Sequence, residues 1–148
     1  MSRRNLVRMT DAEIAAYLAE PHLCRIGTIG PGGSIHMVAM NYGFLGDIPT
    51  FWSYRRAQKI RNLERDPTVG MIVDSGVGYA ELKGVHLMGR AEIIDDQALV
   101  AELGASMVRR YGTANEAVAQ SSAPKRVVIK VHADKVLSWD HAKLAGGY

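Results

Sequence analysis

The chain has 148 residues, of which 47% are hydrophobic and 22% are charged. This length and composition predict one folded domain, 1–148, and exclude both a disordered chain and separate cofactor and substrate domains. The net charge of +3 is too small for a nucleic-acid-binding domain, which typically presents a dense basic face.

The sequence shows none of the features that direct a chain to a membrane or to an oxidising compartment. The apolar runs are only a few residues long, and no apolar stretch follows the basic segment 1–10, so we expect neither a membrane span nor a signal peptide. The single cysteine, Cys24, can form neither an internal disulfide nor a cysteine zinc site. These observations predict a cytoplasmic protein.

The first third of the chain predicts a capped helix followed by a β-hairpin. Thr10 and Glu13 form a capping-box pattern, and Pro21 ends the helix that they begin. Residues 23–29 and 34–44 are two β-type runs around a glycine- and proline-rich turn, which indicates a hairpin.

The rest of the chain alternates between strands and helices. Further strands are predicted at 50–54, 68–73, 79–94 (as one or two strands, with bulges at its glycines) and 125–131. Helices are predicted at 56–65, which an Asp-Pro pair stops, and at 95–111, where apolar residues recur at four-residue spacing. Residues 121–124 are predicted to form a loop, and 136–148 a tail.

These elements predict a mainly β protein with flanking helices. There are about six strands, most of them joined by short turns, which favours antiparallel pairing. Helices follow too few strands to build a doubly wound parallel sheet. A closed or partly open antiparallel barrel fits best, because closure removes exposed sheet edges.

The segment from Trp52 to Asn62 is the strongest candidate for a ligand site. It runs from a strand end into a helix start, where free backbone N–H groups and the helix dipole favour an anion. Arg56 and Lys59 would add charge-assisted hydrogen bonds, and no acidic residue lies between Arg55 and Asn62. A phosphate group is the predicted ligand, and the alternative is a solvated basic helix face.

Residues 34–42 are a second candidate for contact with a ligand. Glycine, methionine and small residues on a strand would let a flat ring approach the backbone closely. The same pattern is typical of ordinary barrel lining, and from the pattern alone the lining is favoured.

Other chemistries find no support in the sequence. None of the five histidines has partners at a metal-ligand spacing, so no metal site is predicted. There is no G-x-S-x-G nucleophile motif, and the Gly-Pro-Gly-Gly turn matches no phosphate-binding loop. No catalytic side chain is therefore assigned.

Several segments of the chain, taken in order, match the pattern of one family. They are Gly27–Gly33, Ile35–Met40, Arg56–Pro67, Lys83–Ile94 and Ser138–Leu144. The sequence from Thr10 to Leu144 resembles the pyridoxamine 5'-phosphate oxidase-like split β-barrel superfamily, and within it the branch that uses flavin or the deazaflavin coenzyme F420. The basic Gln-Lys-x-x-Asn-Leu-x-x-Asp-Pro segment and the Ser-Trp-Asp-His tail are specific in combination.

The resemblance implies a six-stranded antiparallel split β-barrel that forms a homodimer, with two cofactor sites in grooves between the subunits. The cofactor phosphate would lie on Arg56 and Lys59, assisted by Ser53 or Tyr54. The implied contacts of the ring are Val38, Ala39, Met40 and Asn41, and the implied closing residues from the partner's tail are Trp139 and His141.

The resemblance also implies an activity. The expected protein is an oxidoreductase that binds F420 and transfers hydride to a small unsaturated or quinone-like molecule. An FMN-dependent oxidoreductase on the same fold is one alternative, and a non-catalytic cofactor- or tetrapyrrole-binding protein is the other. Pyridoxamine phosphate oxidation itself is disfavoured, because a further motif for the substrate phosphate is lacking. Arg56 stands where many relatives have lysine, and its planar fork holds a phosphate with a different geometry.

Overall fold

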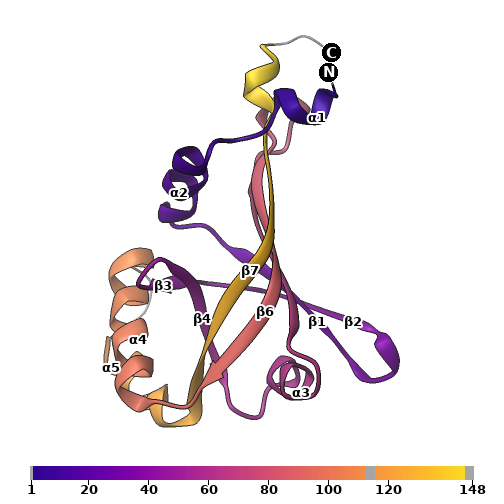
Figure 1. The fold of residues 1–148 in the computed structure, drawn as a ribbon. Coiled ribbons are helices and arrows are strands. Elements are labelled where there is room, and N and C mark those ends of the chain that lie inside the picture. Colours follow the sequence, from indigo (N-terminus) through magenta and orange to yellow (C-terminus); the bar gives the residue numbers. More distant parts are fainter. Residues whose placement is uncertain (1, 113–115, 146–148) are drawn as a thin grey trace.

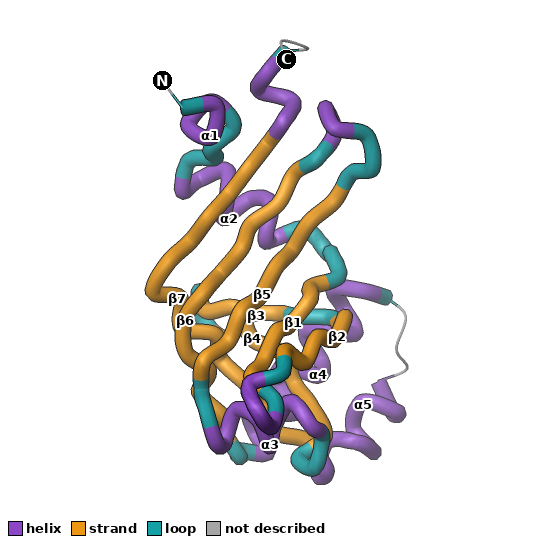
Figure 2. Tube along the Cα trace, turned by 90° about the vertical axis from the view of Figure 1, so that its right-hand side faces the viewer, coloured by secondary structure: helices purple, strands orange, loops and turns teal. Residues whose placement is uncertain are grey.

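The computed structural model describes residues 2–112 and 116–145. One antiparallel sheet in the order β2-β1-β5-β6-β7-β4-β3 curls into a half-barrel (Figure 1; Figure 2). Its seven strands are β1 (Cys24–Ile29), β2 (Ile35–Met40), β3 (Gly43–Leu45), β4 (Ile48–Tyr54), β5 (Thr68–Ser75), β6 (Lys83–Ile94) and β7 (Arg126–Asp140). The predicted class, mainly β with flanking helices and antiparallel pairing, is confirmed.

The predicted number of six strands is wrong, because 34–44 forms two strands rather than one. β2 ends at Met40, and the hydroxyl of the buried Tyr42 donates a hydrogen bond to the Leu18 carbonyl at 2.7 Å. The Tyr111 hydroxyl accepts the Tyr42 N–H at 3.2 Å and lies 3.0 Å from the Tyr42 carbonyl oxygen. The backbone of Tyr42 is therefore unavailable to a sheet ladder, and the chain restarts as β3 on the opposite edge of the sheet.

The predicted tail 136–148 is partly a strand. β7 continues to Asp140 and pairs with β6 over the full length of β6. The register shifts next to Gly89, so that Asp134 has no partner across the ladder. Residues 146–148 of the predicted tail lie outside the described residues.

The helices are α1 (Arg3–Leu6), α2 (Asp11–Ala19), α3 (Gln58–Arg65), α4 (Gln97–Tyr111) and α5 (Glu116–Ser122). The capping box of α2 is confirmed, whereas α1 was not predicted and α5 extends into the predicted loop 121–124. Short 3-10 turns complete the chain: η1 (Pro31–Gly33), η2 (Tyr79–Glu81), η3 (Ala123–Lys125) and η4 (His141–Leu144). None of the described helices combines the length and the apolar character that a membrane crossing requires.

The long β6 and β7 strands separate the two ends of the molecule. In Figure 1, α3 lies at the lower end, and α1 and the yellow η4 lie at the upper end. Helices α4 and α5 lie beside β3 and β4, away from α3. The start of β7 therefore lies at the lower end and its last residues at the upper end.

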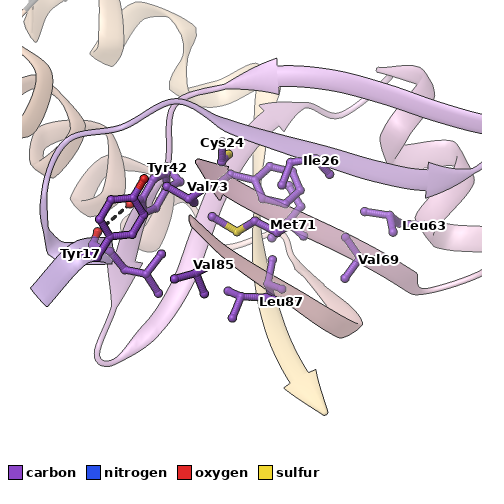
Figure 3. Packing of buried hydrophobic residues seen from close by; sticks show 14 of the residues in the cluster. Tyr17, Cys24, Ile26, Tyr42, Leu63, Val69, Met71, Val73, Val85 and Leu87 are labelled. Atoms are coloured by element: carbon purple, nitrogen blue, oxygen red, sulfur yellow. Dashed lines mark hydrogen bonds between the residues drawn. The ribbon is translucent and has the colours of Figure 1, made fainter. Parts of the chain in front are cut away.

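The inner side of the curled sheet holds the larger core. Ile26 of β1 and Met71 of β5 are fully buried in it (Figure 3). Tyr17 of α2 and the pair Ile60 and Leu63 of α3 close this core from two directions. Burial of this core fixes both helices on the sheet.

A second core lies on the outer side of β4 and β7, where α4 packs. Leu103 and Met107 of α4 contact the cluster that contains Val128 of β7, whereas Val127 and Ile129 belong to the inner core. β7 is thus buried on both faces in this part, which explains its uninterrupted apolar run.

Replacement of Gly89 by alanine is expected to destabilise the protein. A Cβ at Gly89 would overlap the His132 carbonyl oxygen, and overpacking of this kind costs about 1–3 kcal/mol of unfolding free energy. Gly78→Ala is the matched control, because Gly78 has φ −70° and an added Cβ would lie 3.5 Å from the nearest atom, on Glu81. Urea unfolding of both variants measures the difference, and equal stabilities would contradict the close approach of β7 to Gly89.

Candidate functional site

The chain turns sharply between β4 and α3. β4 ends at Tyr54, and α3 begins at Gln58 rather than at Arg56, with Ala57 as an N-cap that offers no side-chain acceptor. Within 2–112 and 116–145, the backbone N–H groups of Gln58 and Lys59 have no acceptor. Free N–H groups and the helix dipole give this junction a partial positive charge, which favours an anion.

A buried amide holds the first turns of α3 against β1. Asn62 is 0% exposed, and its Nδ2 donates to Thr28 Oγ1 at 3.0 Å. Its Oδ1 accepts a hydrogen bond from Gln58 Nε2 at 2.8 Å, and Arg65 adds a bond to the Ile29 carbonyl at 2.9 Å. These bonds are satisfied within the fold, so the helix start has a fixed position relative to the sheet.

A groove of about 450 Å³ lies beside this junction. Its lining residues are Tyr54, Arg55, Arg56, Pro124 and Lys125. The Arg55 guanidinium is paired with the Asp95 carboxylate at 2.6 Å. Arg56 and Lys125 pair with no carboxylate in the described part of the chain. The groove therefore carries uncompensated positive charge.

Arg126 and Lys59 add two further cations. The Arg126 guanidinium carbon lies 4.3 Å from the Trp52 ring centroid and 4.2 Å from that of Tyr54. Lys59 is half-buried, and its pKa is lowered by burial and then by the positive charge of Arg126. Among the described residues, no carboxylate pairs with either cation. An anion between them would offset both the burial and the mutual repulsion.

Not all of the residues predicted to contact the phosphate lie on the wall of the groove. Arg56 and Tyr54 line the groove, and Lys59 lies close enough to Arg126 for the two charges to interact. Ser53 is buried, and its hydroxyl donates to the Tyr54 carbonyl at 3.4 Å. Ser53 is thus used within the fold rather than on the groove wall.

The four predicted ring contacts lie on and after an edge strand. Val38 and Met40 are half-buried against the inner core, whereas Ala39 between them is exposed. Asn41 follows the strand and is half-buried. Among the described strands β2 pairs only with β1, so within that part of the chain the backbone groups on its outer edge have no strand partner.

Trp139 and His141 are not brought near Lys59 within one chain. Trp139 is at the end of β7 and His141 begins η4, at the opposite end of the molecule from α3 (Figure 1). Arg126 and Trp139 are separated by about 40 Å along β7, at about 3.3 Å per residue. One chain alone cannot combine the two groups of predicted residues in one site.

Sequence reasoning missed Lys125 and Arg126. Lys125 lines the groove, and Arg126 lies beside it over the Tyr54 ring, because β4 and β7 pair with Tyr54 opposite Arg126. The available signal was a basic pair at the start of the last predicted strand. Nothing local in the sequence links that pair to the helix start at Gln58, because the contact depends on strand order.

The described residues form neither a metal site nor a nucleophilic cysteine site. Residues 2–112 and 116–145 contain no group of three or more His, Cys, Asp or Glu residues that could hold a metal ion. Cys24 is buried, and burial raises the pKa of its thiol to about 12. A thiol of this kind stays protonated and is a poor nucleophile.

Residues 10–140 match the family model for pyridoxamine 5'-phosphate oxidase. Among solved structures, a conserved hypothetical protein from Mycobacterium tuberculosis is 30% identical with a TM-score of 0.91, over 100% of this chain and 95% of that chain. An F420 reductase is 23% identical with a TM-score of 0.69, over 82% of this chain and 93% of its own. The heme storage protein HutZ from Vibrio cholerae is 14% identical with a TM-score of 0.69, over 86% and 94%. A comparison with curated proteins gave no match.

The last two similarities demonstrate a shared fold. Each of these two structures is less than 25% identical to this chain, and each superimposes over more than four fifths of it. The family match covers most of the chain, including all of α3 and β7. The groove described above therefore lies inside the matched region.

Replacement of Lys59 by methionine is expected to raise the thermal stability of the protein in the absence of phosphate ligands. The folded state depresses the pKa of Lys59, so its charged form is disfavoured there relative to the unfolded chain. The gain in melting temperature should be a few degrees at neutral pH. It should shrink as the pH rises through the lowered pKa of the folded state toward the ordinary pKa of lysine, because the folded protein then releases the proton before the unfolded chain does.

Thermal unfolding in phosphate-free buffer measures this effect. Arg61→Met is the matched control, because Arg61 is an exposed cation on the same helix. A loss of stability in Lys59→Met, with no loss in the control, would mean that Lys59 already has a compensating partner.

Proposed function

The chain belongs to the pyridoxamine 5'-phosphate oxidase family, and on this premise we propose that it is an oxidoreductase that binds a phosphate-bearing deazaflavin, coenzyme F420. Its second substrate would be a small unsaturated or quinone-like molecule, which accepts hydride. One observation carries the proposal: the groove at the start of α3 gathers cations that no carboxylate of the described chain compensates. FMN in place of F420 is the alternative on the same site.

The groove residues fit a phosphate monoester or diester. Arg56 and Arg126 are forked donors, and Lys59 is a point charge on the half-buried side of the site. The free N–H groups of Gln58 and Lys59 supply further donors without any rearrangement. The Asn62 bonds hold these donors in place before the anion arrives, which reduces the ordering cost of binding.

The flat ring of the cofactor would lie along β2. The open edge of β2 offers backbone N–H and C=O groups to a heterocycle, and the small side chain of Ala39 lets a ring approach them. The cofactor, when bound, supplies the hydride chemistry, and the protein supplies binding, orientation and exclusion of water. This division of labour agrees with the absence of a catalytic pair in the sequence.

Two structural neighbours support different candidate ligands. The sequence pattern that includes the tail favours the deazaflavin branch, and an F420 reductase is a structural neighbour. The heme storage protein among the neighbours supports a non-catalytic tetrapyrrole binder as a second candidate. That candidate requires tight ligand binding without turnover of any electron acceptor.

The proposed assembly is a homodimer in which the tail of one subunit closes the cofactor site of the other. The outward residues of β2 support it, because Ile35 is 73% exposed and Met37 is 57% exposed, and a second copy would cover them. The separation of Trp139 from Lys59 supports it too, because only a partner could bring such a tail to the groove.

The double variant Arg56→Ala with Lys59→Ala is expected to weaken cofactor binding by roughly 100-fold or more. Each charge-assisted hydrogen bond contributes roughly 1.5–3 kcal/mol, and about 1.4 kcal/mol is tenfold in affinity. Fluorescence titration with F420 and, separately, with FMN measures the effect. Arg61→Ala is the matched control for a lost charge on α3, and its affinity should be unchanged.

Selective binding of F420 by the unmodified protein supports the proposal, and selective binding of FMN moves the protein to the flavin alternative. If neither cofactor binds at micromolar concentrations, the proposal fails and tetrapyrroles become the ligands to test. If a cofactor binds with equal affinity to the double variant, its phosphate lies elsewhere.

Mixed dimers test the contribution of the partner's tail. One chain carries Arg56→Ala with Lys59→Ala, and the other carries Trp139→Ala with His141→Ala. Each chain alone should bind cofactor weakly, whereas co-refolded chains should recover high affinity in about a quarter of the sites, because half of the dimers are mixed and each has one intact site. Calorimetric stoichiometry measures the recovery. No recovery would mean that each site is built from one chain.

A further inference from the structure

A second cavity lies at the opposite end of the molecule from the basic groove. It has a volume of about 560 Å³ and is bounded by α1, the end of β7, η2 and η4. In Figure 1 these elements gather at the upper end, where the β6 and β7 strands leave the body. A cavity of this volume accommodates a small organic molecule.

Contacts between residues distant in the sequence build this cavity. The N–H of Asp140 donates to the Val7 carbonyl at 2.7 Å, and the N–H of Met9 donates to Ser138 Oγ at 3.1 Å. Lys143 Nζ of η4 donates to the Arg8 carbonyl at 2.9 Å. The segment that follows α1 is thereby fixed along the end of β7, and it holds α1 over the cavity.

The rim of the cavity is positively charged. Arg3, Arg4 and Arg8 line it with exposed side chains, and within the described chain these guanidinium groups have neither an ion pair nor a hydrogen bond. No acidic residue of the described chain lines the cavity. Asp140 is already paired with Lys83 at 3.1 Å and Glu13 with Lys143 at 2.7 Å, and the Glu81 carboxylate of η2 accepts the Gly78 N–H at 3.2 Å.

The wall of the cavity is aromatic and held in place. Trp139 lies so close to Gly84 of β6 that a Cβ there would overlap its ring, so the glycine is what allows the indole to lie against the sheet. The ring of His141 is 4.5 Å from that of Tyr79, and His141 Nδ1 donates to the Tyr79 carbonyl at 2.8 Å. Because that carbonyl can only accept, Nδ1 carries the proton, and Nε2 of the neutral ring is the acceptor.

We propose that this cavity binds a planar organic anion, with its carboxylate on the rim of Arg3, Arg4 and Arg8 and its ring against Trp139. Arginine forks match a carboxylate in geometry and charge, and an indole face suits a flat apolar ring. The ring of the ligand would stack on the indole of Trp139, and its carboxylate would pair with the three arginines of the rim. The site is separate in one chain from the phosphate groove, which lies at the other end of β7.

The inference that this anion is the hydride acceptor rests on the proposed function, whereas binding of the anion does not. If the tail of one subunit closes the cofactor site of the other, Trp139 and His141 adjoin the cofactor, and the cavity beside them holds the second reactant. The substrate class then narrows from small unsaturated molecules to anionic ones with a planar conjugated system.

A single-tryptophan protein gives a direct readout of binding. The chain has two tryptophans, so Trp52→Phe leaves Trp139 as the only tryptophan, and excitation at wavelengths that tyrosine does not absorb reports on it alone. Anthranilate is the probe, because it is a planar aromatic carboxylate that accepts excitation energy from tryptophan. Methyl anthranilate is the matched ligand, because it keeps the ring and lacks the charge. Isothermal calorimetry on the unmodified protein repeats the measurement, since Trp52 packs closely against Gly104 and its replacement could disturb folding.

Anthranilate is expected to quench Trp139 saturably. The triple variant Arg3→Gln, Arg4→Gln and Arg8→Gln should bind anthranilate about 100-fold more weakly than the unmodified protein does. The unmodified protein should bind methyl anthranilate more weakly than anthranilate by a similar factor. Arg109→Gln, an exposed arginine in the last turn of α4, is the control and should leave the affinity unchanged.

Equal affinity for the acid and its ester, or unchanged affinity in the triple variant, would overturn the proposal. The variant Arg56→Gln with Lys59→Gln separates the two sites: it should lose cofactor and keep anthranilate. Binding of anthranilate to a protein that binds no F420 or FMN would leave this site standing and end the proposed function alone. If the protein binds cofactor normally but binds no anthranilate, the proposed anion site fails and the proposed function stands.

Discussion

The β6–β7 ladder is the constraint on which the arrangement of the sites depends. It runs from Lys83 opposite Asp140 to Ile94 opposite Val128, and neighbouring strands add to both of its sides. Because β7 is one continuous strand, its first residue, Arg126, and its last aromatic residue, Trp139, are held at opposite ends of the molecule. The glycine at position 89 admits the shift in register, and Gly84 admits the indole. The ladder therefore separates the basic groove from the aromatic cavity within one chain.

In the basic groove, the features proposed to bind an anion oppose the stability of the fold. Folding brings Lys59 out of water and close to Arg126, and burial lowers the pKa of the lysine. The core under α3 and the buried Asn62 network hold the helix start in place despite this repulsion. An anion that arrives finds the donors already positioned and the charge unbalanced. The same features that make the empty groove unfavourable therefore contribute to affinity.

The sequence predicted features that depend on neighbours in the chain. The capping box of α2, the strand-to-helix junction at Arg56 to Lys59 and the apolar run of β7 were all local patterns. It could not predict the break at Tyr42, which depends on a hydroxyl from α4. The mostly polar residues 132–135 concealed the second half of β7. The pairing of β4 with β7 concealed the part of the groove that Pro124 and Lys125 line. In each case the missing information was a contact distant in the sequence.

The central claim is that the free amides at the start of α3 hold the phosphate of the cofactor. The most direct measurement follows backbone amide chemical shifts of the isotope-labelled protein during titration with the cofactor that binds, and with inorganic phosphate. The account predicts that the amides of Gln58 and Lys59 show the largest chemical-shift changes with both ligands. In the titration with the cofactor, these changes should saturate with the affinity that the fluorescence titration of the same cofactor gives. Saturable cofactor binding that leaves these two amides unmoved would contradict it.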